Sequence, residues 1–238
     1  MLTYNGKPIT VATNRFSKSG VKRVKRGVIV HTYEAGEMLS MDRIVANLGT
    51  PGLRKVPDSN PVRFYGSCYH AFPDYRNAGY VQVLEADCGP FSAPPLNKDF
   101  WHICIPGFAR QTRAEWSDSV STAQIQGVAK FIADKAGIDH FLLWHDTPNA
   151  LKTGGTGLFG HRDVTTAYGP IGGHTDPGPA FPWDVLLGRV ADLVCKEWDW
   201  ATVADAQAAL KVPVTGYWDR PTAVNYRNLC LFLAALGK

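Results

Sequence analysis

The sequence predicts an α/β protein, with a mostly buried, mixed β-sheet at its centre, helices flanking the sheet, and a small helical appendage at the C-terminus. Short apolar runs alternate along the chain with segments of helical, amphipathic spacing. Hydrophobic residues make up 45% of the chain and charged residues 19%, which is typical of a globular protein and excludes a disordered one. The length of 238 residues suits one good-sized domain plus a small appendage.

The first predicted strand is a short β-rich run, Val28 to Val30, that stops at His31. Residues 38–48 follow with the apolar spacing of a helix, which a Thr-Pro-Gly sequence ends. Residues 52–66 contain two prolines and many polar side chains, so we expect a loop there.

The middle of the chain is expected to supply a hairpin, a third strand and the longest helix. Residues 68–72 and 80–86 have the composition of strands, and the segment between them is rich in turn residues. Residues 100–107 form a further apolar strand. Residues 112–137 carry an apolar stripe at helical spacing, with Ser121 as the expected N-cap and a glycine at the end.

Beyond this helix, residues 138–145 have the apolar character of another buried strand. Residues 146–182 are rich in glycine and are expected to form long loops. Residues 182–198 are amphipathic and begin with a proline, which favours a helix.

Positive charge is concentrated at the N-terminus. Residues 1–26 contain seven Lys and Arg side chains and no Asp or Glu, whereas the remaining residues have 18 basic and 21 acidic side chains. This basic arm could approach a polyanion, either nucleic acid or an anionic cell-wall polymer, or it could be a solvated flank that aids solubility.

The N-terminus lacks the apolar core of a secretory signal, and no apolar run approaches the roughly 20 residues that span a bilayer. We therefore expect a soluble protein made in the cytoplasm. Five widely spaced cysteines form no C-x-x-C pair, which favours buried free thiols, with an incidental pair such as Cys68 and Cys88 left open.

Two histidines and one aspartate stand at positions suited to a functional site. His31 ends an apolar strand, His161 lies in a glycine-rich segment, and Asp176 lies in a proline-rich turn. Two imidazoles and a carboxylate are a ligand set for a catalytic zinc with an open fourth position. A histidine at the end of a strand is more often structural, so spacing leaves both interpretations open.

Four segments resemble the zinc-dependent type 2 N-acetylmuramoyl-L-alanine amidases, a family with the peptidoglycan-recognition-protein fold that includes many phage endolysins. They are VIVHTY, SCYHAF, FGHRDV and HTDPGPAFPWDVLL, and they occur in the family's order over about residues 27–190. The most specific element is G-H-x-D followed by D-P-G-P-x-F-P-W-D.

The resemblance implies that His31, His161 and Asp176 bind Zn²⁺. It also implies that Tyr69 lies over the metal, as does the tyrosine of phage-type members. Many relatives have a lysine, which stabilises the oxyanion, where this chain has His174. We therefore expect Tyr69 and His174 to be the catalytic side chains.

For other polar residues the sequence leaves alternatives open. The catalytic glutamate that some relatives carry on the third strand is absent, so the general base is not identified. Asp163 could orient a ligand imidazole or cap a loop. The remaining histidines are expected to line the core or the cleft wall; they are His70, His102, His140 and His145.

The sequence thus predicts three parts: a basic N-terminal arm (1–26), a zinc amidase domain (27–198) and a helical tail (199–238). The tail resembles a shortened peptidoglycan-binding module through a Q-x-x-L-like helix, a V-x-G-x-x-D-like turn and Thr222. A helical hairpin packed on the catalytic domain is the alternative.

The predicted function is that of a peptidoglycan hydrolase that cleaves the amide bond between N-acetylmuramic acid and L-alanine, as a phage endolysin does when it lyses the host cell wall. The alternative is a non-catalytic peptidoglycan-recognition protein of the same fold. Bacterial peptidoglycan is the expected partner. We expect a monomer that neither binds nucleic acid nor inserts into a membrane, and that acts on the wall after release from the host cytoplasm.

Overall fold

The computed structural model describes residues 2–50, 54–55, 64–65, 67–169, 173–216 and 218–235. Most of the loop predicted for residues 52–66 lies outside the described residues. Two short strands lie within it, β5 (Arg54–Lys55) and β6 (Phe64–Tyr65), and they pair antiparallel with each other.

A mixed sheet of five strands forms the centre of the protein, as the sequence predicts. Its strands lie in the order β11 (Gly157–Gly160), β4 (Gly27–Thr32), β10 (Trp101–Ile105), β7 (Ala71–Asp74) and β8 (Gly79–Gln82). The first four run parallel, and β7 and β8 form the predicted hairpin, which places β8 antiparallel at one edge. Every residue of β4 and β10 is buried because helices and loops cover both faces of the sheet.

Side chains alternate between the two faces of the sheet and so divide the core in two. Val28 and Val30 pack with the helices α2 (Ser119–Asp139) and α5 (Trp183–Glu197) in the largest apolar cluster. Ile29 lies in a separate cluster on the other face. The two-residue period therefore directs His31 to the face opposite α2 and α5.

The helices begin and end close to the predicted positions, with one correction at each end of α2. Helix α1 (Met41–Leu48) starts after Ser40, whose hydroxyl caps it. In α2 the N-cap is Asp118 and not Ser121, because the Asp118 carboxylate accepts a hydrogen bond from the Ser121 amide at 2.7 Å. The helix continues past the expected glycine and ends at His140, which takes the left-handed conformation with φ of 52°.

The strand predicted over residues 138–145 is wrong. Residues 141–143 are buried, but the backbone of the segment joins the sheet only through an isolated bridge between His145 and Leu158. Side chains of the tail satisfy its carbonyl groups instead: Trp218 Nε1 donates to Leu143 and Arg227 Nε to His140. An apolar run in the sequence indicates burial but does not indicate which groups the backbone bonds to. It therefore could not distinguish a strand of the sheet from a segment whose carbonyls accept hydrogen bonds from the tail.

The long loop predicted over residues 146–182 is also wrong in part, because it contains three short elements. These are α3 (Pro148–Lys152), β11 and α4 (His161–Tyr168). Helix α3 and strand β11 have five residues or fewer, which is too short for a periodic pattern, and glycines flank β11 and α4. The missed strand β11 forms one edge of the central sheet.

The N-terminal residues fold onto the body of the protein. A small hairpin of β1 (Thr3–Tyr4) and β2 (Lys7–Pro8) leads through a 3-10 turn, η1 (Thr13–Arg15), to β3 (Phe16–Lys18). Strand β3 pairs with β9 (Cys88–Pro90), and a second 3-10 turn, η2 (Glu115–Ser117), precedes α2.

Several basic side chains of this arm bind backbone carbonyls. The Arg15 guanidinium donates to the carbonyls of Asn47, Thr50 and Ser67. The buried Lys25 ammonium donates to the Lys98 carbonyl at 2.8 Å. Arg26 binds the carbonyls of Leu151 and Gly155, while Lys18 and Arg23 lie within 4 Å of Asp87 and Asp99. Much of the positive charge therefore serves the fold.

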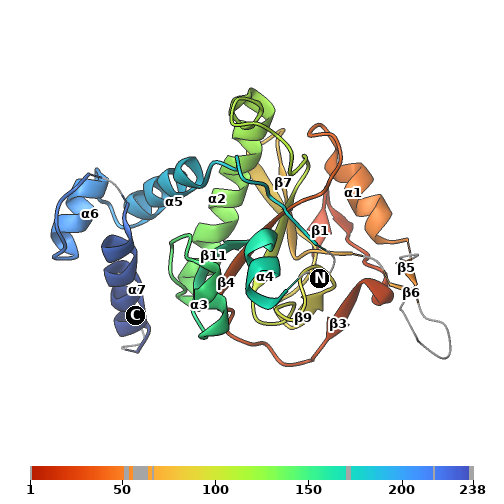
Figure 1. The fold of residues 1–238 in the computed structure, drawn as a ribbon, viewed down its shortest axis with the longest axis horizontal. Helices are drawn as coiled ribbons and strands as arrows, with labels where there is room; N and C mark the ends of the chain where they lie inside the picture. Colours follow the sequence, from red (N-terminus) through yellow and green to blue (C-terminus); the bar gives the residue numbers. More distant parts are fainter. Residues whose placement is uncertain are drawn as a thin grey trace.

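The tail consists of α6 (Val203–Ala209) and α7 (Arg220–Ala235), which lie with α5 at one end of the molecule (Figure 1). Apolar side chains of the tail belong to the main core cluster; they are Ala206, Leu210, Trp218, Ala223, Tyr226 and Cys230. The tail thus packs on the part of the chain that precedes it. All five cysteines are buried free thiols. None of the helices in the described ranges combines the length and apolarity needed to cross a bilayer.

Replacing Trp218 with alanine should destabilise the whole protein, because this side chain is 7% exposed and its indole donates to Leu143 in the domain. Loss of a buried tryptophan costs about 3–5 kcal/mol, which lowers the Tm of a chain of this size by roughly 10 °C. Thermal unfolding measures the effect, and Leu231→Ala on the exposed side of α7 is the control. Equal, small changes in both variants would show that the tail does not support the domain.

Candidate metal centre

The candidate site lies where β4 ends. His31 is the fifth residue of this strand and its side chain is fully buried. Its neighbours on the same face come from β10: in the parallel register Cys104 pairs with His31, and His102 precedes it by two residues. The ring of Tyr69, just before β7, lies 4.8 Å from the His31 ring.

The adjacent strand brings His161 to the same edge of the sheet. Strand β11 runs parallel to β4 with Gly160 opposite Val30, and His161 follows directly as the first residue of α4. Because parallel strands end at one edge, the pairing of β11 with β4 places the two imidazoles side by side.

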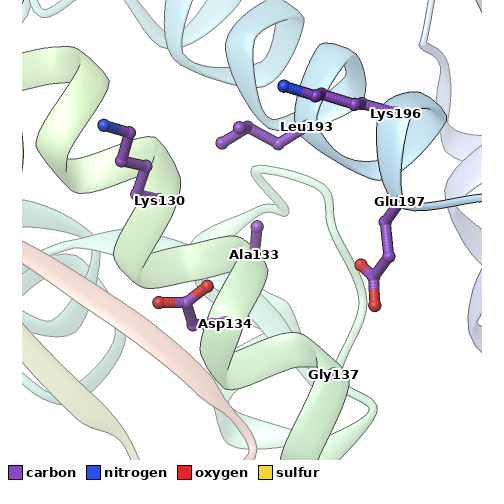
Figure 2. A pocket seen from close by; sticks show the side chains of 7 residues that line it. All are labelled: Lys130, Ala133, Asp134, Gly137, Leu193, Lys196 and Glu197. Atoms are coloured by element: carbon purple, nitrogen blue, oxygen red, sulfur yellow. The ribbon is translucent and has the colours of Figure 1, made fainter.

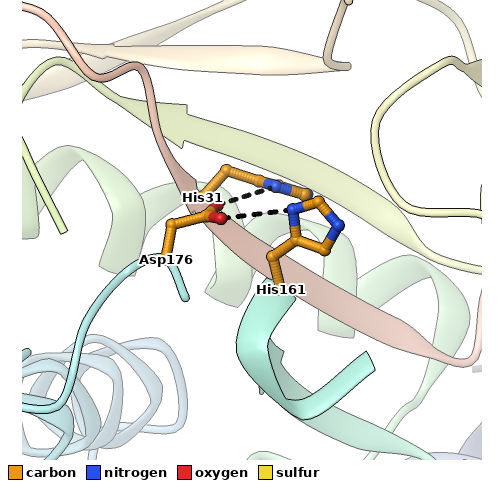
Figure 3. A group of neighbouring side chains, drawn as sticks. All are labelled: His31, His161 and Asp176. Carbon is orange, nitrogen blue, oxygen red and sulfur yellow. Dashed lines mark ion pairs between the residues drawn. The ribbon is translucent and has the colours of Figure 1, made fainter. Parts of the chain in front are cut away.

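Asp176 lies in the loop before α5. The Arg162 amide donates to the Asp176 carbonyl at 2.8 Å, which fixes the loop against the start of α4. Gly160 permits this contact, since a Cβ at this position would meet Pro177 Cδ at 2.6 Å. The side chain of Asp176 is 9% exposed and points between the two imidazoles (Figure 3).

The three side chains present their ligand atoms to one another. His31 Nδ1 lies 3.2 Å from Asp176 Oδ2, and His161 Nδ1 lies 3.3 Å from Asp176 Oδ1. In the part of the chain that the structure describes, these three side chains form a group of His, Cys, Asp or Glu residues that could hold a metal ion. The ligand atoms of this group all lie within 4.8 Å of one another. The structure therefore brings together the three residues for which the sequence predicted metal binding.

Burial and charge favour a neutral His31 beside an ionised Asp176. Burial lowers the pKa of His31 to about 4, although the Asp176 carboxylate opposes this shift. Burial raises the pKa of Asp176, but the surrounding imidazoles of His161, His174 and His31 lower it more, to well below its usual range. Neutral imidazole and ionised carboxylate are the forms that bind metals.

A zinc ion fits this ligand set. His31 Nδ1 is buried and, despite its nearness to Asp176, has no aligned hydrogen-bond partner. Such a buried, unpartnered nitrogen is costly unless a ligand uses its lone pair. Two ligands of a tetrahedral zinc lie roughly 3.3 Å apart, which matches both imidazole–carboxylate distances. His31, His161 and Asp176 would hold the ion and leave a fourth position open.

The two predicted catalytic side chains flank the cluster. Burial raises the pKa of Tyr69 well above its ordinary value, so its hydroxyl is even less acidic than that of a free tyrosine. The His174 ring stacks on His161 at 4.0 Å, and its Nδ1 lies 3.6 Å from Asp176 Oδ1. The His174 side chain is 40% exposed, so it forms the solvent-facing side of the cluster.

Asp163 acts as a helix cap. Its carboxylate accepts from the Gly160 amide at 2.7 Å and pairs with His145 Nε2 at 3.1 Å. The His145 ring stacks on Trp183 at 3.8 Å. Asp163 thus fixes the start of α4, of which His161 is the first residue, which is the loop-capping role that the sequence left open.

One residue near the cluster was not predicted as part of it. His102, expected to line the core or the cleft wall, is fully buried and lies against His31, with His31 Nε2 and His102 Nδ1 3.1 Å apart. The alternation of side chains along β10 could have indicated that His102 faces the cluster, since His102 and Cys104 share one face of this strand. The sequence does not reveal that β10 is the strand beside β4.

A surface groove of about 440 Å³ lies between α2 and α5. Charged side chains of both signs surround a small apolar floor in this groove (Figure 2). Its lining residues are Lys130, Ala133, Asp134, Gly137, Leu193, Lys196 and Glu197. None of the predicted site residues lines it.

Several solved structures are similar to this chain. The hydrolase AmiA of Staphylococcus aureus matches with a TM-score of 0.53 and 15% identity, over 81% of this chain and 84% of that one. The N-acetylmuramoyl-L-alanine amidase LysC of Clostridium intestinale has 14% identity over 80% and 87% of the two chains, with a TM-score of 0.43. Drosophila peptidoglycan recognition protein SD has 15% identity over 74% and 85%, with a TM-score of 0.39.

No protein-family model matches the chain, and no curated sequence does. At 15% identity, the likeness to AmiA establishes that this chain has the fold of that hydrolase. This fold is the α/β architecture that the sequence predicts.

The metal-free protein should lose stability as the pH falls from about 6.5 toward 4. Burial holds the pKa of His31 at about 4, so the unfolded chain takes up a proton in this range that the folded chain excludes. The loss is on the order of 3 kcal/mol for this residue, and burial lowers the pKa of His70 in the same direction. Urea unfolding across this pH range measures it. In His70→Leu the free energy of unfolding should depend less steeply on pH. A free energy of unfolding that stays constant over this range in the wild type would contradict the expectation.

Proposed function

We propose that the protein is a zinc-dependent N-acetylmuramoyl-L-alanine amidase that hydrolyses peptidoglycan. One observation carries the proposal. A buried cluster of two imidazoles and one carboxylate lies at the edge of the central sheet, in a chain that has the fold of the hydrolase AmiA. The motifs around His31, His161 and Asp176 support the same activity through their resemblance to the type 2 amidases.

Zinc in this site would supply a Lewis acid that polarises the scissile carbonyl and lowers the pKa of a water molecule from about 15.7 toward 7. The protein must also stabilise the oxyanion that develops on the carbonyl oxygen. Tyr69, whose hydroxyl is protonated at neutral pH, and the solvent-facing His174 are the two donors beside the cluster. His174 takes the position at which many relatives have a lysine, and its side chain is exposed to solvent.

A non-catalytic peptidoglycan-recognition protein is the alternative, and it would bind the same polymer without cleavage. The complete ligand set favours the enzyme, because loss of catalysis needs only the loss of one ligand. The role of a phage endolysin is part of the proposal and rests on the sequence resemblance. We also propose that the tail contributes to binding of the wall. A chain that ends near Trp198 should then still cleave soluble muropeptides but sediment less with sacculi than the full chain, and its unfolding would show that the tail is structural.

Asp176→Ala should abolish both zinc binding and hydrolysis. The variant removes the carboxylate that both ligand imidazoles face, so a stoichiometric zinc ion in the wild type should be lost. Elemental analysis of purified protein and chromatography of digested sacculi measure the two effects. Asp192→Ala, at an exposed position of α5, is the control. A wild type that binds zinc and wall but releases no peptide would support the recognition protein instead.

His174→Ala should lower kcat by roughly 100-fold or more while the zinc content stays the same. The expected loss is that of one donor to the developing oxyanion. Turnover of a soluble muropeptide, measured beside the zinc content of the same preparation, separates catalysis from metal binding. His174→Lys restores the residue of many relatives and should recover part of the rate. Near-normal turnover of the alanine variant would exclude His174 from catalysis.

A further inference from the structure

Three buried histidines lie in a row behind the metal centre. His31 on β4, His102 on β10 and His70 just before β7 are each fully buried. Neighbouring rings are stacked, with centroids 5.3 Å apart for His31 and His102 and 5.7 Å apart for His102 and His70, both at an angle of 25°. The proposed hydrolysis uses the first of these residues and leaves the other two without a role.

The hydrogen bonds of His102 determine which of its nitrogens carries the proton. His102 Nε2 lies 3.4 Å from the Leu96 carbonyl, which can only accept, so Nε2 is the donor. In a neutral imidazole the other nitrogen then accepts. His102 Nδ1 faces two groups that can donate to it, the Ser92 hydroxyl at 2.9 Å and His31 Nε2 at 3.1 Å.

This arrangement in turn fixes the tautomer of His31. Because His102 Nδ1 accepts, the proton of a neutral His31 lies on Nε2 and donates to it. His31 Nδ1 is then left with a free lone pair. It is this nitrogen that lies 3.2 Å from the Asp176 carboxylate and has no aligned hydrogen-bond partner.

We propose that His102 is a positioning residue that holds His31 in the tautomer whose Nδ1 can bind a metal, an inference that rests on the proposed zinc site. His102 touches no substrate and is not itself a ligand, because both of its ring nitrogens already face hydrogen-bond partners. A carboxylate, a carbonyl or water usually orients a metal-binding histidine. Here a neutral imidazole takes that role and adds no charge to the buried face.

His70 provides a matched control. Its ring is as buried as that of His102, but it acts on backbone: His70 Nδ1 accepts from the His102 amide at 3.0 Å, and Nε2 lies 3.1 Å from the Cys88 carbonyl. Replacing His70 therefore removes a buried imidazole from the row without removing the acceptor that His31 uses.

The test compares the zinc affinities of His102→Leu, His102→Asn and His70→Leu with that of the wild type, by competition with a chromophoric chelator. Loss of an outer partner of a metal ligand typically costs 10- to 100-fold in affinity, and we expect about this loss for His102→Leu. The asparagine amide oxygen takes the place of Nδ1, so His102→Asn should bind zinc within a few-fold of the wild type. His70→Leu should do the same, even where its Tm falls. Equal losses in the two leucine variants, or none in His102→Leu, would overturn the proposal.

A second measurement needs neither zinc nor a stable leucine variant. Long-range ¹H–¹⁵N correlation spectra of the metal-free wild type report which nitrogen of each imidazole is protonated, and the assigned His31 should carry its proton on Nε2. His102→Asn should keep this tautomer. A proton on His31 Nδ1 in the wild type would overturn the inference. A wild type that has the expected tautomer but binds no zinc would refute the proposed function and leave the His31–His102 pairing intact.

Discussion

The parallel pairing of β4 with β11 is the constraint on which the candidate site depends. It sets Gly160 opposite Val30, so that the strand-end His31 and the helix-start His161 emerge at one edge of the sheet. The Asp163 cap fixes the first turn of α4. The loop that carries Asp176 then docks on Gly160, where the missing side chain leaves room for Pro177. A shift of one residue in this register would turn His31 to the opposite face.

The site combines deep burial with unpaired hydrogen-bonding capacity, and this combination is unfavourable for the fold. A buried carboxylate and several buried imidazoles lose their hydration, a cost that hydrogen bonds and charge partners must offset. The imidazoles around Asp176 keep its carboxyl ionised, whereas His31 and His102 remain neutral through burial. A divalent cation would satisfy the unpartnered His31 Nδ1 and balance the carboxylate charge. Binding of such a cation would therefore also stabilise the folded protein.

The N-terminal arm and the C-terminal tail lie outside the predicted catalytic domain, but both pack against it and form hydrogen bonds with it. The tail fills the core beside α5 and supplies hydrogen bonds to residues 140 and 143, which no neighbouring strand satisfies. At the other end of the chain, Arg15 binds three backbone carbonyls and Lys25 is buried. The arm's positive charge thus has structural uses that need no polyanion. The contacts at both ends make it difficult to remove either segment without loss of stability.

The sequence by itself determined the α/β class and the order of most strands and helices, because local periodicity encodes them. Short motifs also identified His31, His161 and Asp176 as candidate metal ligands. The sequence did not reveal β11, the capping of α2 by Asp118, or the absence of a strand over residues 138–145, since each depends on which distant group satisfies a backbone donor or acceptor. Only the tertiary structure decided that β10 lies beside β4. That neighbourhood turns His102 from a core residue into the partner of a candidate ligand, because strand order is set by packing between segments about 70 residues apart.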